Sequence, residues 1–218
     1  MHQRSALAAL ATAGAYGAFA ATFRGPRDRF WPRMTRTGAC LGTLALVLEP
    51  SLQPRRPRAR DVLLGGAIAG GLYAAFQVGD RAARRILPRG GEEIGDIYRL
   101  RELRPPSELA LRLALVVGPA EELFWRGLLQ RTLQRRLGRG RAAAAASLLY
   151  GGAHLVTGNR TLIAAATVAG ASWSLLAAAG APMTSLIVSH SLWDVWIFLV
   201  QPTQKSGAAD PQGALGHS

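Results

Sequence analysis

The feature that most constrains the fold of this chain is the alternation of long apolar runs with short arginine-rich segments. The apolar runs cover residues 5–23, 37–48, 62–79, 109–129, 142–156, 161–179 and 182–200. A helix of about 17 to 25 apolar residues is long enough to cross a bilayer and satisfies its own backbone hydrogen bonds there. The sequence therefore predicts an all-α, polytopic membrane helix bundle of about seven transmembrane helices, with the run 37–48 marginal as a full span.

The charge composition also favours a membrane location. Charged residues make up 18% of the 218 residues, whereas soluble proteins carry about a quarter. The net charge is +13, and Lys205 is the only lysine. Because the arginines flank the apolar runs without aromatic interleaving, we expect anionic lipid headgroups, and not nucleic acid, as partners. Arginines occur on nearly every loop of the first half, so the positive-inside rule sets no firm orientation.

The chain divides into three parts. Residues 1–107 hold N-terminal spans and basic loops with no motif, 108–201 form a motif-bearing helical core, and 202–218 are a polar tail expected to be disordered. Within the first part, Gly66 and Gly70 form a small-xxx-small pattern that permits close helix contact. The polar segment 81–106 is either a short amphipathic helix at the interface or a solvated loop.

Three of the apolar runs carry polar residues spaced four apart. The pairs are Glu122 and Arg126, Tyr150 and His154, and His190 and Asp194. Residues four apart share a helix face, so each pair can be one helix satisfying itself. Such pairs stabilise membrane proteins by only about 0.6 kcal/mol on average, which is poor compensation for the cost of inserting ionisable groups. Three pairs together therefore favour a functional site.

These residues can activate water. Glu121, in apolar surroundings, can act as a general base, and His154 can hold the water or share its proton. His190 with Asp194 can donate hydrogen bonds to an oxyanion. Alternatively, Glu121, His154 and His190 can hold a divalent metal such as zinc. The His-Glu-x-x-His signature is absent, Cys40 is the only cysteine, and spacing leaves both versions open.

The three motifs resemble those of a known family. Glu-Glu-x-x-x-Arg from Glu121 to Arg126, Tyr-x-x-x-His ending at His154, and His-x-x-x-Asp ending at Asp194 are similar to the pattern of the CAAX protease and bacteriocin-processing family of intramembrane endopeptidases. The resemblance covers residues 108–200, and Tyr150 stands where the family usually has phenylalanine.

The resemblance implies a role for each residue. Glu121 would activate water with His154, and His190 with Asp194 would stabilise the oxyanion or bind a metal. Glu122 and Arg126 would form a structural or substrate-orienting pair. The family is commonly described as metalloproteases, although members are also argued to work without a catalytic metal. Pro119 removes a backbone hydrogen bond and could kink the helix, which would admit water to the acids.

We therefore expect an intramembrane endopeptidase in a bacterial cell membrane. It would hydrolyse a peptide bond near the membrane surface in a peptide or prenylated protein substrate. Two alternatives remain open from the sequence: a proton- or cation-coupled transporter that uses the same Glu and His residues, and a catalytically silent membrane scaffold. The sequence sets no oligomeric state.

Overall fold

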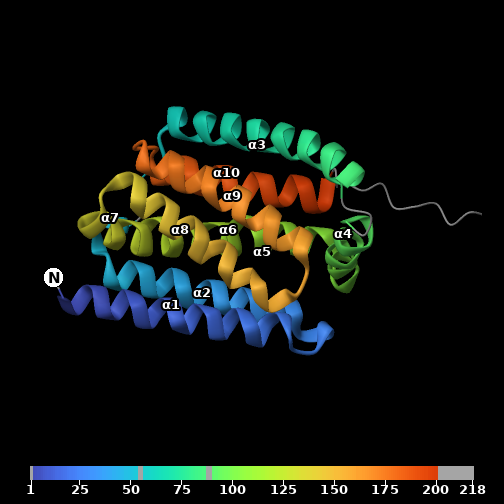
Figure 1. The fold of residues 1–218 in the computed structure, drawn as a ribbon, viewed down its shortest axis with the longest axis horizontal. Helices are drawn as coiled ribbons and strands as arrows, with labels where there is room; N and C mark the ends of the chain where they lie inside the picture. Colours follow the sequence, from blue (N-terminus) through green and yellow to red (C-terminus); the bar gives the residue numbers. More distant parts are fainter. Residues whose placement is uncertain (1, 54–55, 87–89, 201–218) are drawn as a thin grey trace, which may run out of the picture.

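The computed structural model describes residues 2–53, 56–86 and 90–200, and the predicted tail 202–218 lies outside them. The described part of the chain is built of helices joined by short turns, and the long helices lie along one common direction (Figure 1). The predicted all-α bundle is therefore confirmed. Within the described residues, three π-helical and four 3-10 segments join or extend the α-helices.

The α-helices are α1 (His2–Phe23), α2 (Phe30–Leu48), α3 (Ala59–Ile86), α4 (Gly90–Tyr98), α5 (Pro106–Arg112), α6 (Gly118–Glu121), α7 (Arg131–Leu137), α8 (Arg139–Ala153), α9 (Arg160–Ala178) and α10 (Met183–Val195). The π-helical segments are η4 (Leu113–Val117), η5 (Glu122–Gln130) and η7 (Trp196–Val200). Short 3-10 turns are η1 (Arg27–Arg29), η2 (Pro50–Leu52), η3 (Arg99–Leu103) and η6 (His154–Thr157).

Four helical stretches in the described residues are long and apolar enough to cross a membrane: Ser5–Phe23, Ala59–Gly79, Arg160–Ala178 and Met183–Val200. The marginal run 37–48 belongs to a longer helix, α2, which begins at Phe30. Large apolar side chains on the outer surface remain exposed, such as Leu63 (74%) and Leu148 (70%), as expected where lipid is the solvent. The count of seven spans stays a prediction.

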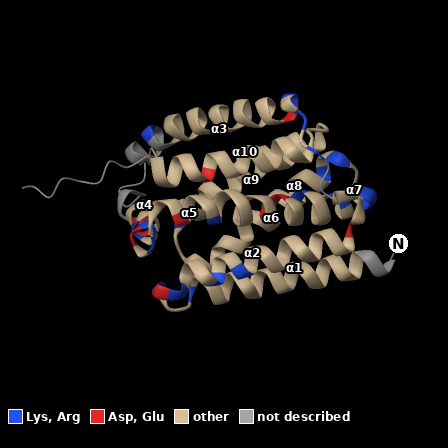
Figure 2. Cartoon of the chain, turned by 180° about the vertical axis from the view of Figure 1, so that it is seen from behind, with Lys and Arg blue, Asp and Glu red and all other residues tan. Residues whose placement is uncertain are grey.

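Charged residues gather at the two ends of the bundle, and few lie along its middle (Figure 2). The exceptions are on the helices labelled α6 and α10, which carry the polar motifs (Figure 2). The protein is therefore an integral membrane helix bundle with ionisable groups buried in its interior.

The central rod of the bundle runs without interruption from Pro106 to Leu137 through α5, η4, α6, η5 and α7. Pro119 does not break it. In η4 the Gly118 N–H bonds to Leu113 O, five residues back, so Pro119 would have bonded to Ala114 O in the same register. Ser191 Oγ of α10 donates to Ala114 O at 3.0 Å instead. The suggested kink is thus replaced by a π-helical segment whose freed carbonyl is satisfied by a neighbouring helix.

Helix α10 lies between the central rod and α3 (Figure 1). Its contact with α3 depends on Gly65, where a Cβ atom would come within 2.7 Å of Val188 and 2.8 Å of Ser185 O. At Gly66 and Gly70 the space within 4 Å is open, so the predicted small-xxx-small contact was assigned to the wrong glycines. The close contact is at Gly65, one residue before the predicted Gly66. The helical repeat of a sequence does not show which face of the helix points inward, and this explains the error.

The polar segment 81–106 contains a helix, as one of its two interpretations predicted. Trp31 Nε1 donates to Leu100 O at 2.8 Å, which ties η3 to α2. Glu93 of α4 accepts hydrogen bonds from the Thr161 N–H at 2.8 Å and the Thr161 hydroxyl at 2.7 Å. These bonds lower the pKa of Glu93 below its usual value. Helix α4 is therefore fixed to the start of α9 at one end of the bundle.

Candidate functional site

Three separate helical segments meet at one interior cavity of about 440 Å³. Its polar lining comprises Glu121, Tyr150, His154, Thr161, His190 and Asp194. The rest of the wall is mostly apolar and includes residues of α1, α2, α3 and η3, such as Phe23, Trp31, Phe76 and Leu100. A largely apolar cavity with a few convergent polar groups is the usual form of a ligand or catalytic site. The N-terminal third, which carries no motif, thus builds part of the wall.

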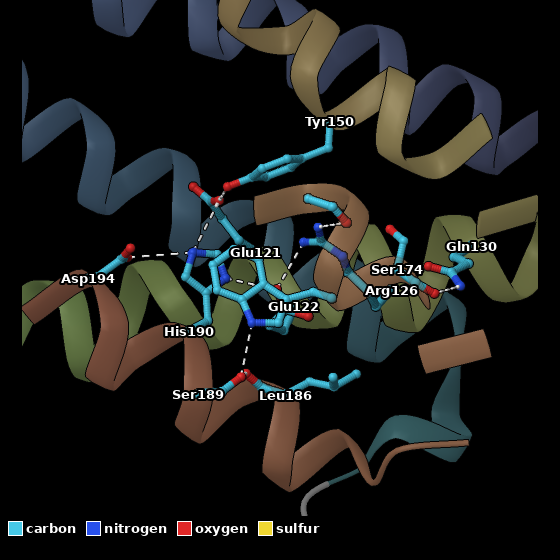
Figure 3. A network of polar contacts seen from close by, with 12 residues as sticks. Glu121, Glu122, Arg126, Gln130, Tyr150, Ser174, Leu186, Ser189, His190 and Asp194 are labelled. Carbon is cyan, nitrogen blue, oxygen red and sulfur yellow. Dashed lines mark hydrogen bonds and ion pairs between the residues drawn. The ribbon is translucent and has the colours of Figure 1, made fainter. Parts of the chain in front are cut away.

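Glu121 faces this cavity, although it is only 4% exposed. The Tyr150 hydroxyl donates to Glu121 Oε2 at 2.7 Å. His190 Nε2 lies 3.9 Å from the same oxygen. Both partners come from helices distant in sequence, so Glu121 is the point where the three motifs meet (Figure 3).

His154 lies at the end of α8 with its tautomer fixed by the backbone. Its Nδ1 is 3.0 Å from Tyr150 O. Because a carbonyl oxygen only accepts, Nδ1 carries the proton and Nε2 is left as an acceptor in the neutral ring. The imidazole packs edge-on against Phe19 at 5.5 Å and Tyr150 at 5.1 Å between centroids. The ring is thereby oriented toward the cavity that it lines.

His190 lies among three carboxylates. Its Nδ1 is 2.8 Å from Glu122 Oε1, which accepts the hydrogen bond. Its Nε2 is 3.5 Å from Asp194 Oδ2 and 3.9 Å from Glu121 Oε2. One imidazole nitrogen is therefore anchored in the protein interior, and the other faces the carboxylates that line the cavity (Figure 3).

The Glu122–Arg126 pair is fully buried and does not line the cavity. Arg126 Nη1 donates to Glu122 Oε1 at 2.9 Å, and Nη2 donates to Gly170 O of α9 at 2.9 Å. The guanidinium carbon lies 4.6 Å from the Tyr150 ring centroid, a cation–π contact. Because Glu122 Oε1 binds both Arg126 and His190, the pair connects the rod to α9 and α10.

Sequence reasoning missed Trp173 of α9. Its indole stacks on His190 with centroids 3.9 Å apart and planes at 14°. Trp173 Nε1 donates to Ser189 Oγ at 3.0 Å, and this hydroxyl donates to Leu186 O at 2.8 Å. The only signal in the sequence was a tryptophan in an alanine-rich span. The Tyr150 hydroxyl was noted as a departure from the family pattern, but its contact with Glu121 was not foreseen.

The three suggested metal ligands come near one another without forming a ligand set. Glu121 and His190 are 3.9 Å apart at their closest polar atoms, and His190 Nδ1 is already bonded to Glu122. Over the described residues, no group of three or more His, Cys, Asp and Glu side chains is arranged to hold a metal ion. A catalytic zinc site needs three protein ligands at about 2.0–2.2 Å, and the described side chains, as they are placed, do not form such a set.

Fold and site together define an integral membrane bundle with a buried carboxylate–imidazole cluster at an interior cavity. Residues 105–196 match the family model for type II CAAX prenyl endopeptidases of the Rce1-like kind. This match supports the resemblance drawn from the three motifs: the segment that carries them is similar to the CAAX protease family. Comparison of the chain with curated proteins and with solved structures gives no match.

Proposed function

We propose that the protein is an intramembrane endopeptidase whose peptide substrate enters the cavity bordered by α8, α10 and the central rod. The observation that carries the proposal is that Glu121, His154, His190 and Asp194, from three separate segments, line one cavity. The family match at residues 105–196 supports the same class of enzyme. The roles below rest on the geometry of these side chains.

In the proposed reaction, a water molecule lies between Glu121 and the Nε2 atom of His154. Glu121 takes a proton from this water while the water oxygen forms a bond to the carbonyl carbon of the scissile peptide. The carbonyl oxygen becomes an oxyanion. His190, protonated at both nitrogens, donates its Nε2–H to that oxyanion, and Asp194 compensates its charge. The tetrahedral intermediate then collapses, the C–N bond breaks, and the proton held by Glu121 passes to the leaving amine.

The other buried groups hold these residues in place. The Tyr150 hydroxyl occupies one oxygen of Glu121 at 2.7 Å, which leaves the other oxygen for water. Glu122, with Arg126, holds His190 Nδ1 at 2.8 Å, so that Nε2 points to the cavity. Side chains held by packing and hydrogen bonds need no reorganisation during the reaction, which is where such sites gain most of their rate.

The substrate is proposed to be a peptide or prenylated protein, since the wall of the cavity is mostly apolar. Anionic lipid headgroups remain the expected partners of the arginines at both ends of the bundle (Figure 2). The bacterial cell membrane remains an expectation from the resemblance. The proposed steps use the protein's own residues, because the side chains of residues 2–53, 56–86 and 90–200 form no set of metal ligands as they are placed. Zinc dependence is left to the test.

The decisive experiment is a cleavage assay on purified protein in lipid, with prenylated and unprenylated reporter peptides. Wild type and Glu102→Gln, a glutamate exposed outside the cavity, should cleave equally. Glu121→Gln should lose activity by about 10²–10⁴-fold. A chelator should leave the rate unchanged, and a loss restored by zinc would overturn the metal-free steps but not the peptidase. Absence of cleavage of every peptide by wild type would favour the transporter or the scaffold.

A further inference from the structure

Two buried hydroxyl groups in the bundle differ from the others. Most helical Ser and Thr side chains return their hydroxyl to the carbonyl four residues earlier. In this chain Thr12, Thr22, Thr35, Ser147, Thr167 and Ser172 all do so. Ser174 and Ser185 are 0% exposed, yet within the described residues their Oγ atoms have no hydrogen-bond partner.

Other unpartnered polar atoms lie on the face of the rod that packs against α9. Among them are Glu122 Oε2, Arg126 Nε and Gln130 Oε1, while the indole nitrogens of Trp125 and Trp193 are also without a partner within the described residues. Glu122, Arg126 and Gln130 follow one another at intervals of four along η5. Arg126 donates to Gly170 O at 2.9 Å, and Gln130 Nε2 donates to Ser174 O at 2.8 Å. Figure 3 shows Arg126, Ser174 and Gln130 in a row that leads away from His190.

We call this set of five residues, Glu122, Arg126, Gln130, Ser174 and Ser185, the polar file. One end of the file is at the site, because Glu122 Oε1 bonds to His190 Nδ1 at 2.8 Å. At the other end, the next helical turn after Gln130 brings Gln134, and the next after Ser174 brings Ala178. Both residues line a surface pocket of about 480 Å³ at the α7 end of the bundle, together with Arg131 and Arg135.

Ser185 is included in the polar file because it lies on the face of α10 that packs against α9. It lies four residues before Ser189, which bonds to Trp173 of α9 at 3.0 Å. Residues four apart share a face, so Ser185 is directed toward α9 one turn closer to the α7 end. The file is therefore bordered by the central rod, α9 and α10 together.

Buried polar atoms without a partner are strongly unfavourable in an apolar interior. A water molecule in such a place commonly makes two to four hydrogen bonds to groups of this kind, whereas apolar cavities stay dry. Five unpartnered atoms on three packed helices, leading from the buried Glu122–Arg126 pair toward a surface pocket, are groups that bound water molecules can satisfy.

We propose that the polar file binds a chain of water molecules that connects the surface pocket at α7 with Glu122 and His190. This route is separate from the cavity that Glu121 and His154 line. It lets protons and water exchange with the inner side of His190 while a peptide fills the cavity. The ligand is water itself, held by the amide oxygen of Gln130 and the hydroxyls of Ser174 and Ser185.

The test measures access of a water-sized cation to single cysteines. In a Cys40→Ser background, Ser174→Cys is compared with the matched control Ser147→Cys, whose native hydroxyl is bonded within its own helix at 2.7 Å. Ag⁺ should react with Ser174→Cys at least about tenfold faster, because hydrated paths admit small cations that apolar packing excludes. Equal rates for the two cysteines would overturn the proposal. The Ag⁺ reaction rate of Ser185→Cys is a second, independent measurement: it should also exceed that of Ser147→Cys, and equal rates would again overturn the proposal.

The direction of entry is tested by closing the surface pocket. Adding Ala178→Phe should slow the Ag⁺ reaction of Ser174→Cys by about tenfold, since the ring fills the space that water would use. An unchanged rate would mean that water reaches Ser174 from the main cavity, and the route from α7 would be wrong. These readings need no cleavage activity, so they stand or fall independently of the peptidase. A high-resolution diffraction structure with no water within about 3.2 Å of Gln130 Oε1 would also refute the file.

Discussion

The Tyr150 hydroxyl donates a 2.7 Å hydrogen bond to Glu121 Oε2, so the residue that departs from the family pattern contacts the carboxylate proposed to activate water. The same ring packs against Arg126, Trp125 and His154. Tyr150 therefore makes one polar contact with the acid and several packing contacts with its surroundings, and the two contributions can be separated by substitution.

We predict that Tyr150→Phe lowers the cleavage rate by about tenfold, because one hydrogen bond to Glu121 is lost and the ring packing is kept. Tyr150→Ala should cost at least about a hundredfold, since it removes the ring that contacts Arg126 and orients His154. Steady-state kinetics on a reporter peptide measure both variants. If Tyr150→Phe were as inactive as Glu121→Gln, the hydroxyl would itself take part in the reaction.

Trp173 is predicted to position His190. Trp173→Phe keeps an aromatic ring against the imidazole but removes the donor to Ser189, and we expect a loss of kcat of about tenfold. Trp173→Ala should also destabilise the fold by about 3–5 kcal/mol. Thermal unfolding in detergent and kcat, measured on the same samples, separate the two effects. The control is Trp196→Phe, which changes a half-exposed tryptophan of η7. If this variant lost as much kcat as Trp173→Phe, the loss would not be specific to Trp173, and the proposed positioning of His190 would be wrong.

The buried Glu122–Arg126 pair gives a prediction about stability. Arg126→Met removes the guanidinium partner of a fully buried carboxylate, which keeps only its bond to His190, and should destabilise the protein by about 3–5 kcal/mol. The double variant Glu122→Gln with Arg126→Met should recover much of that loss, because no unpaired charge remains. It should stay inactive, since His190 Nδ1 loses its ionised acceptor. Unfolding temperature and cleavage rate report the two properties, and full activity of the double variant would show that the pair does not position His190.

The sequence predicted the all-α bundle, and it singled out the polar residues that line the cavity, Glu121, His154, His190 and Asp194. The polar pairs on Glu122, His154 and His190 were visible because ionisable residues are rare within apolar runs, so each one is informative. The meeting of Glu121, His154 and His190 at one cavity is a geometric fact that spacing cannot supply. Whether each residue has the role assigned to it stays a prediction, since the geometry places the groups without showing a reaction.

What could not be predicted depends on helix phase and on contacts between distant segments. The choice between Gly65 and Gly66 at α3 is a matter of one residue in phase. The π-helical register at Glu122–Gln130 and the stacking of Trp173 on His190 arise from tertiary packing that overrides local pattern. The N-terminal helices carry no motif, and their part in the cavity wall follows only from the three-dimensional arrangement.

Gly118 is predicted to control the approach of α10 to the central rod. A Cβ atom at this position would come within 2.8 Å of Ser191 Oγ and 3.1 Å of the Ser191 backbone. Gly118→Ala should therefore push α10 outward, displace His190 and reduce cleavage by at least about tenfold. The matched control is Gly17→Ala, where the space within 4 Å is open, and its activity should be unchanged. Equal activity of both variants would show that α10 can shift without moving His190.

The contact of Glu93 with Thr161 predicts how the position of α4 depends on pH. The Thr161 hydroxyl and amide hydrogen-bond the ionised carboxylate and lower the pKa of Glu93 below 4.5. A group with a lowered pKa stabilises the folded state above its unfolded pKa, and this contribution is lost as pH falls through the folded pKa. Hydrogen exchange of residues 90–103, corrected for intrinsic rates, should therefore show α4 protected at neutral pH and less protected below pH 4.5. Glu93→Gln should lower the protection at neutral pH and remove its dependence on pH. If α4 in Glu93→Gln still lost protection from hydrogen exchange in acid, Asp96 or Glu102 would be responsible instead.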